Sequence, residues 1–203
     1  MVNTDKSLIE AHCGGDRTAF GELVRRYGDS VLGYLMRMTG NREQAEDLFQ
    51  ETFKRVHEKA HTFRGLARPS TGGLGFKNWL FRIATNAAID GLRRQKRLRI
   101  VSLNQSAGCC DENCDELGAV TAADCCDASD EAMLAEQKEQ VRQAVDELPA
   151  KQRATLVLAY YQQLSYSEVA EVMGCSTGTV KVQMSRALRT LARRLPDTSG
   201  GAQ

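Results

Sequence analysis

The sequence has few of the features that mark membrane, exported or fibrous proteins. Its 203 residues include only three prolines, and no apolar run approaches the roughly 20 residues that span a bilayer. The N-terminus, MVNTDKSLIEAHCGGD, has charges and glycines where a signal peptide needs an unbroken apolar stretch. Hydrophobic residues make up 42% and charged residues 26%, as in soluble globular proteins, and we expect the protein in the cytoplasm without membrane insertion.

Motifs of catalysis are lacking as well. The chain has no glycine-rich phosphate loop followed by Lys-Ser or Lys-Thr, and no metalloprotease histidine pair. Its three histidines, His12, His57 and His61, have no evident triad setting. We therefore predict that the protein is not an enzyme and that it requires no cofactor.

Charge is distributed unevenly along the chain. Residues 1–103 carry 18 Lys and Arg against 11 Asp and Glu, residues 104–140 carry 1 against 10, and residues 141–203 carry 8 against 5. Basic blocks suit a polyanion such as nucleic acid, which would repel an acidic segment. We predict two domains, residues 1–103 and 141–196, joined by a flexible acidic linker of residues 104–140 and followed by a disordered tail, residues 197–203.

Hydrophobic periodicity predicts helix nearly everywhere outside the linker. Apolar residues recur at three- and four-residue steps over residues 44–56 and again over residues 78–96. Further helices are expected over residues 131–147 and 151–162, and no alternating strand pattern of convincing length occurs. The sequence therefore predicts an all-α fold of two small helical domains.

A helix-turn-helix pattern occupies residues 164–195. Ser165 and Glu168 have the spacing of a capping box, Gly174 suits a left-handed turn, and Ser176 can cap a second helix. A second helix with a polar, basic leading end suits the major groove of DNA. Its expected buried stripe is Val180, Met184, Ala187, Leu188 and Leu191.

The segment from Leu148 to Leu191 resembles region 4 of RNA polymerase sigma factors, especially the small extracytoplasmic-function (ECF) branch of the sigma-70 family. In that family this domain reads the minus-35 promoter element. The family often has a Ser-Arg pair after Gly-Thr-Val-Lys, whereas this chain has Val182 and Gln183, a departure that bears on base preference and not on docking. The resemblance implies these minus-35 contacts: Ser176, Thr177, Thr179, Lys181, Val182 and Arg186.

The block from Phe20 to Arg99 resembles region 2 of the same family. Within it, AEDLFQETFKRV is similar to the helix that grips the clamp helices of the largest polymerase subunit, which implies polymerase contacts by Asp47, Gln50 and Glu51. A helix with one apolar and one mixed polar face is suited to docking on another protein's helices. A solvated acidic face is the alternative for this helix.

The stretch NWLFRIATNAAIDGLRRQKR is similar to the family's helix beneath the minus-10 element, where the strands separate. It ends in a dense run of cations suited to tracking phosphates, which Asp90 would orient by pairing with Arg93 or Arg94. Trp79 and Phe81 are candidate melting wedges, with a plain core position as the alternative for Trp79, and the preceding loop, residues 64–76, would receive a flipped base. The implied minus-10 contacts are Arg64, Asn78, Arg82, Asn86, Arg93, Arg94, Lys96 and Arg97.

Five cysteines lie within eighteen residues of the acidic linker, a departure from the family's usual pattern. They could close a thiolate site for zinc or take up copper(I), although the spacing is not the paired CxxC of zinc sites. Metal binding, redox sensing and incidental composition all remain open. We hypothesise that metal or oxidation changes the separation of the two domains. The residues are Cys109, Cys110, Cys114, Cys125 and Cys126.

These features predict a sigma factor that binds core RNA polymerase and directs it to particular promoters. The expected partners are core polymerase, promoter DNA and an anti-sigma factor. The alternatives are a stand-alone helix-turn-helix regulator, which would bind duplex DNA without polymerase, and a metal-buffering or sensing protein. The block from Phe20 to Arg99 favours the sigma factor, because a stand-alone regulator needs no polymerase-docking region.

Overall fold

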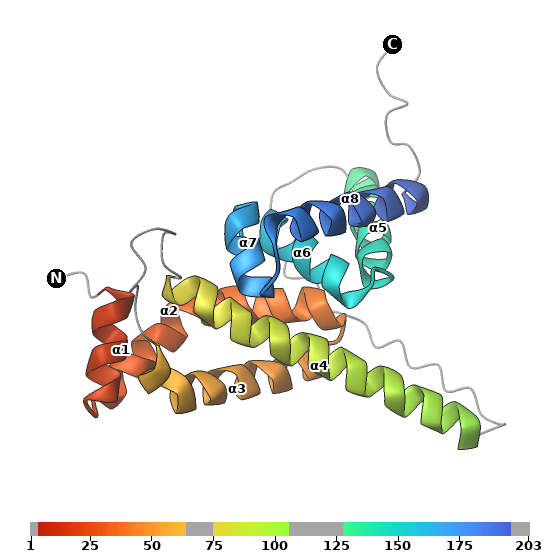
Figure 1. Cartoon of the computed structure of the whole chain (residues 1–203). Coiled ribbons are helices and arrows are strands. Elements are labelled where there is room, and N and C mark those ends of the chain that lie inside the picture. The colour runs from red at the N-terminus through yellow and green to blue at the C-terminus, as the bar shows by residue number, and fades with distance from the viewer. Residues whose placement is uncertain (1–3, 64–74, 106–127, 196–203) are drawn as a thin grey trace, which may run out of the picture.

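The computed structural model describes residues 4–63, 75–105 and 128–195, which form eight α-helices and one short 3-10 helix. No strand occurs in these three stretches. The predicted all-α fold is therefore confirmed, and the helices form two layers, α1 to α4 and α5 to α8 (Figure 1). These layers are named the first and second modules below.

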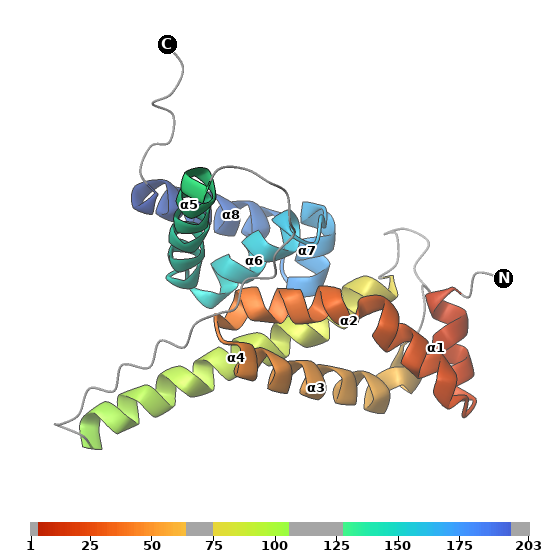
Figure 2. The same ribbon diagram turned by 180° about the vertical axis from the view of Figure 1, so that it is seen from behind.

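The first module is built around three long helices. These are α2 (Arg17–Thr39), α3 (Arg42–Lys59) and α4 (Phe76–Gln105), with α1 (Asp5–Cys13) across one end and the 3-10 helix η1 (Ala60–Thr62) after α3 (Figure 2). Each long helix buries an apolar stripe against the others, as its sequence period requires. The stripes include Leu23, Val31, Tyr34, Leu35, Met38, Ala45, Leu48, Phe53, Val56, Leu80, Phe81 and Ala84.

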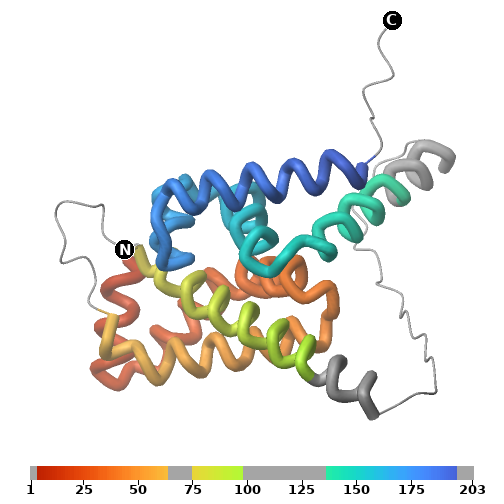
Figure 3. The backbone as a smooth tube through the Cα atoms, turned by 45° about the vertical axis from the view of Figure 1, so that its right-hand side comes forward, coloured from red at the N-terminus to blue at the C-terminus, as the bar shows by residue number. Residues whose placement is uncertain are grey.

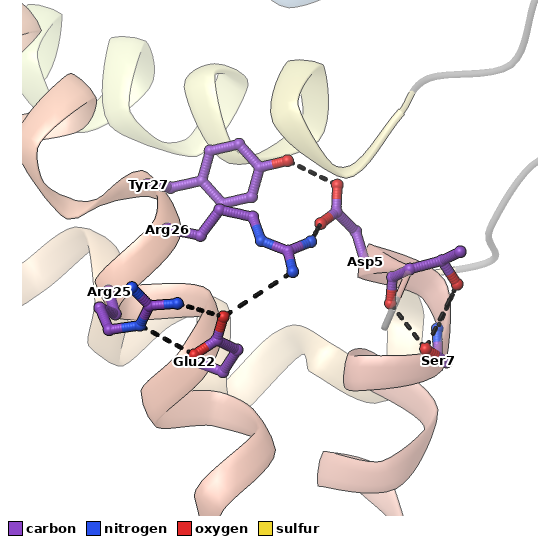
Figure 4. A network of polar contacts seen from close by, with 7 residues as sticks. Asp5, Ser7, Glu22, Arg25, Arg26 and Tyr27 are labelled. Carbon is purple, nitrogen blue, oxygen red and sulfur yellow. Dashed lines mark hydrogen bonds and ion pairs between the residues drawn. The ribbon is translucent and has the colours of Figure 1, made fainter. Parts of the chain in front are cut away.

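A polar network fixes α1 on α2 (Figure 4). The Tyr27 hydroxyl and the Arg26 guanidinium each donate to the Asp5 carboxylate, at 2.5 Å, while Glu22 accepts from Arg25 at 2.7 Å and lies 3.8 Å from Arg26. Burial, followed by the bond to Asp5, raises the pKa of Tyr27 far above its ordinary value. No local sequence pattern predicts the bonds to Asp5, because they join residues more than 20 positions apart.

The second module contains four helices, α5 (Ala128–Asp146), α6 (Ala150–Tyr160), α7 (Tyr166–Met173) and α8 (Thr177–Arg194). Helices α7 and α8 form the predicted helix-turn-helix. Its cap residues are confirmed, because the Ser165 hydroxyl accepts from the Glu168 amide and the Glu168 carboxylate accepts from the Ser165 amide, at 3.3 and 2.8 Å. Gly174 has φ +64°, which L side chains rarely adopt, and this turn therefore needs glycine.

Leu188 is an error in the predicted stripe of α8. Val180, Met184 and Ala187 are buried, but 53% of Leu188 is exposed. Successive helix residues turn by about 100°, so Leu188 lies about 80° from Val180, at the edge of the apolar face. No described side chain of the second module covers that edge, so the sequence period alone assigned one position too many to the core.

Two helices extend further toward the acidic segment than expected. The helix predicted over residues 78–96 runs to Gln105, and the helix predicted from residue 131 begins at Ala128. The chain contains neither glycine nor proline between Gly91 and Gly108, so no residue there interrupts the helix. Part of the predicted linker is therefore helical.

The two modules pack directly on each other, with α6 and α7 lying over α2 and α4 (Figure 3). The Lys77 ammonium donates to the Gln162 carbonyl at 3.0 Å, and the Gln162 side-chain amide donates to the Ser30 carbonyl at 3.2 Å. Arg153 of α6 donates to the Met38 carbonyl at the end of α2, at 2.6 Å. One apolar cluster contains residues of both modules, so they share a core in this arrangement.

Candidate polymerase and nucleic-acid interfaces

The polar face of α3 brings together the three residues predicted to contact polymerase. Asp47, Gln50 and Glu51 lie at three- and four-residue steps and therefore share one side of the helix. Asp47 and Gln50 are exposed, and Glu51 is partly exposed and accepts from Arg55 at 2.5 Å. The opposite face is buried in the first module, which leaves this face available to a partner.

Four of the predicted minus-10 residues form an exposed cationic surface on α4. They are Arg93, Arg94, Lys96 and Arg97. The predicted pairing of Asp90 with Arg93 is present at 3.6 Å. The part of α4 that carries them projects beyond the second module (Figures 1 and 2), so all four are accessible to a polyanion.

The start of α4 is partly covered by the second module. Arg82 and Asn86 are exposed, but only 6% of Asn78 is. Hydrogen bonds from Ser165 lower the pKa of Glu168, and smaller contributions in the same direction come from an Asn78 side-chain bond and the charge of Lys77. Asn78 therefore faces α7 and is not available to DNA in this arrangement.

The two candidate wedges are core or partly buried side chains. Phe81 is fully buried and packs edge-on against Tyr34, with ring centroids 5.4 Å apart. Trp79 packs against Phe63 and Phe76, with centroids 5.1 and 5.9 Å away. The wedge hypothesis is wrong for Phe81 in this structure, because separating base pairs requires an exposed ring.

All six predicted minus-35 residues are exposed at the start of α8. Ser176 also caps this helix, with its hydroxyl accepting from the Thr179 amide at 3.1 Å. The Val180 side of the helix is buried in the module. The exposed set is Ser176, Thr177, Thr179, Lys181, Val182 and Arg186.

Other predicted site residues lie outside the described stretches. These include Arg64, most of the expected base-receiving loop, and the five linker cysteines. The described residues contain no group of three or more His, Cys, Asp and Glu side chains suited to holding a metal ion. Cys13 is exposed, and Cys175 is partly buried, with burial raising its thiol pKa. Among the helices described here, none is both long and apolar enough to cross a membrane.

Sequence reasoning missed the residues that join the modules. Arg153, Lys77 and Gln162 make the polar contacts between them, and Arg37 of α2 stacks on the ring of Tyr161 with 4.2 Å to its centroid. Nothing in the local pattern around Lys77, Gln162 and Arg37 distinguishes them from ordinary surface positions. Only the near absence of charged residues around Arg153 on α6 could have indicated burial.

Comparisons of sequence place both modules in one family. Residues 23–98 match the family described as Sigma-70 region 2, and residues 138–191 match the family described as Sigma-70, region 4. The ECF RNA polymerase sigma factor SigW of Bacillus subtilis is 32% identical over 192 residues, which cover 95% of this chain and 97% of that protein. The RNA polymerase sigma-H factor of Pseudomonas aeruginosa is 31% identical, over 94% and 93% of the two chains.

Solved structures show the same fold. CnrH, in its complex with the cytosolic domain of CnrY, matches with a TM-score of 0.61 at 22% identity, over 94% of this chain and 96% of that one. RpoE of Bartonella quintana, in its complex with the anti-sigma factor NepR, also matches with a TM-score of 0.61. The two are 24% identical, and the match covers 88% of this chain and 98% of that one. These likenesses support the fold alone.

The proteins of this family are transcription initiation factors and not enzymes. Both the amino-terminal and carboxyl-terminal modules match the family, and the SigW relative aligns over nearly the whole chain. The chain therefore belongs to the ECF RNA polymerase sigma factors of the sigma-70 family, and it directs RNA polymerase in promoter-specific transcription initiation.

Proposed function

We propose that three exposed surfaces divide the work of promoter recognition. The polar face of α3, with Asp47, Gln50 and Glu51, docks on the clamp helices of the largest polymerase subunit. The cationic half of α4 lies along the minus-10 DNA, and α8 enters the major groove of the minus-35 element. The observation that carries this assignment is that α4 and α8 each bury one face and present cations on the other.

Binding both promoter elements requires the two modules to separate. The elements are roughly 25 base pairs apart, or about 85 Å at about 3.4 Å per pair. In the structure, a β-carbon at Gly174, just before α8, would lie 4.0 Å from the Arg82 guanidinium on α4. The packed arrangement therefore holds the two DNA-binding helices too close together to reach both elements, and it also covers Asn78.

This opening is expected to be visible by energy transfer between two fluorophores. Unnatural amino acids at the exposed positions Arg25 of α2 and Arg193 of α8 would carry the dyes, which avoids both the docking face of α3 and the seven native cysteines. We expect strong transfer in the free protein and loss of more than half of it when core polymerase and promoter DNA are bound. DNA alone should leave the transfer high.

A dye pair within one module provides the matched control. Labels at Arg25 and Glu10, both in the first module and exposed, should show the same transfer in every state. Opening by duplex DNA in the absence of polymerase would instead support a stand-alone regulator. Unchanged transfer in a complex that initiates transcription would contradict the proposed separation.

We also propose an anti-sigma protein as a partner, as in the RpoE–NepR complex. A groove of about 620 Å³ between α2 and α5 has apolar walls that include Met36, Val141 and Tyr161. Its charged lining residues are cationic except for Asp146; the cations are Arg37, Arg42, Lys138 and Arg142. An acidic amphipathic helix would match both features. Because residues of both modules line the groove, a helix bound there would keep the modules packed together. The energy transfer between the two dyes should then stay high.

The linker cysteines support a third, independent proposal, that zinc, copper(I) or oxidation alters the separation of the modules. Five thiols within eighteen residues, among carboxylates, are enough for a tetrahedral thiolate site. If so, zinc or peroxide should change the fluorescence transfer and the promoter output of the labelled protein. Replacing Cys109, Cys110, Cys114, Cys125 and Cys126 by serine should remove the response.

The double variant Cys13→Ser/Cys175→Ser is the control, because it removes two thiols outside the linker. It should respond as the parent protein does. A response that survives in the five-serine variant, or no response in the parent, would refute the sensor hypothesis and leave the assignment of promoter recognition intact.

A further inference from the structure

Val182 is an apolar side chain in the middle of a polar surface. It is 50% exposed on the second turn of α8, and its exposed neighbours include Thr179, Lys181 and Arg186. A valine that packed against its own module would be buried, as Val180 is. The outward position of Val182 therefore needs an explanation other than the core.

Helix geometry places Val182 at the point of α8 farthest from the module. At about 100° per residue, Val182 is about 160° around the helix from buried Val180. Met184 and Ala187 are buried on the Val180 side as well. If α8 enters a groove with its exposed face leading, Val182 is the side chain that reaches deepest.

Two of the residues next to Val182 along this face, Gly178 and Ser185, are small. Gly178, one turn earlier, has no side chain, and a β-carbon there would meet only Ser176 Oγ, at 3.7 Å. Ser185 follows about one turn later and is exposed. Gly178 and Ser185 therefore leave Val182 room to approach the groove floor, while the long, flexible side chains of Lys181 and Arg186 beside it can extend outward to phosphates.

The floor of the major groove offers one apolar group, the 5-methyl of thymine. Valine has no hydrogen-bond donor or acceptor in its side chain, so it gains no hydrogen bond from any base edge, and only thymine offers it a methyl group to pack against. On the basis of the function proposed above, we propose that Val182 recognises a thymine of the minus-35 element through its 5-methyl group. This residue thereby sets the base preference at one promoter position.

The test removes that methyl group without changing the hydrogen-bonding edge of the base. A minus-35 sequence is first selected from random duplexes with the reconstituted holoenzyme. Each thymine in the selected element is then replaced by uracil, one at a time, and holoenzyme binding is measured. One replacement should weaken binding of the parent holoenzyme by about fourfold, the effect of one buried methyl group.

The same replacement should have little effect on a Val182→Ala holoenzyme, because alanine does not reach the methyl group. Leu188→Ala is the matched control. Leu188 is exposed to a similar extent but lies about 120° around α8 from Val182, so this variant should respond to uracil as the parent does.

Three outcomes would overturn the inference: a selected element without thymine, replacements that are all neutral in the parent, or an equal loss in Val182→Ala. These outcomes leave promoter recognition by α8 standing. If the holoenzyme selected no sequence at all, the proposed function itself would fail, and the two failures are therefore distinguishable.

Discussion

Asp47→Arg is expected to weaken the binding of core polymerase by about thirtyfold and to reduce transcription accordingly. The side chain is exposed on the face of α3 assigned to the polymerase clamp helices, so the change should not disturb the core of the first module. A reversed charge at the centre of a docking face both loses its favourable contact and creates a repulsive one, an effect of about 2 kcal/mol for a central residue. Competition with a labelled parent protein for core polymerase would measure the affinity.

Glu10→Arg makes the same change in charge on α1, outside the segment that matches Sigma-70 region 2. It should bind polymerase within about twofold of the parent, and circular dichroism should show both variants folded. Equal losses in the two variants would indicate a general electrostatic effect. Parent-like binding by Asp47→Arg would remove this face of α3 from the interface.

Arg153→Ala is expected to lower the free energy of unfolding by about 3 kcal/mol. Only 7% of Arg153 is exposed, and its guanidinium donates to the carbonyls of Met38, Asp146 and Leu148 and lies 3.2 Å from the Asp146 carboxylate. The substitution removes these donors and leaves a partly buried carboxylate without its partner. Urea denaturation followed by circular dichroism would measure the loss.

The loss of unfolding free energy in Arg153→Ala should depend on pH. Burial already raises the pKa of Asp146, with Arg153 opposing it, so loss of Arg153 should raise that pKa further. A carboxyl with a raised pKa in the folded state favours folding when protonated, so the variant should recover relative stability as the pH falls through the Asp146 pKa. The difference from the parent should be largest near neutral pH.

Arg142→Ala is the control for this measurement. Arg142 is exposed and pairs with Glu139 at 2.8 Å, and surface pairs of this kind contribute less than about 1 kcal/mol. An equal loss of unfolding free energy in Arg142→Ala and Arg153→Ala would contradict a special role for Arg153. Arg153→Lys keeps the positive charge but not the full set of guanidinium donors. The stability that it retains relative to Arg153→Ala would show how much the charge contributes to the free energy of unfolding.

Features set by neighbouring residues could be predicted. The capping box of Ser165 and Glu168 and the turn at Gly174 depend on bonds within a few positions of the chain, and the structure contains them as expected. The pairing of Asp90 with Arg93 is a contact of the same kind. The exposed polar faces of α3 and α8 could also be predicted, because helix period alone separates them from the buried stripe.

Features set by distant residues could not be predicted. Leu188 was misassigned because the period of a helix does not tell how wide a stripe its neighbours cover. Asn78 is buried by α7, and Phe81 lies in the core against Tyr34, although both belong to a segment whose pattern suggested DNA contact. In each case the deciding neighbour belongs to another helix.

The order of the helices, their caps and their charged faces were determined by the sequence itself, because hydrogen bonds and apolar periodicity act over one or two turns. The packing of the two modules was decided only by the tertiary structure. The bond from Arg153 to Met38 joins residues 115 positions apart, and no local preference records such a contact. Burial is a property of the assembled surface, so which cations meet solvent and which hold the modules together emerges only when the helices have packed.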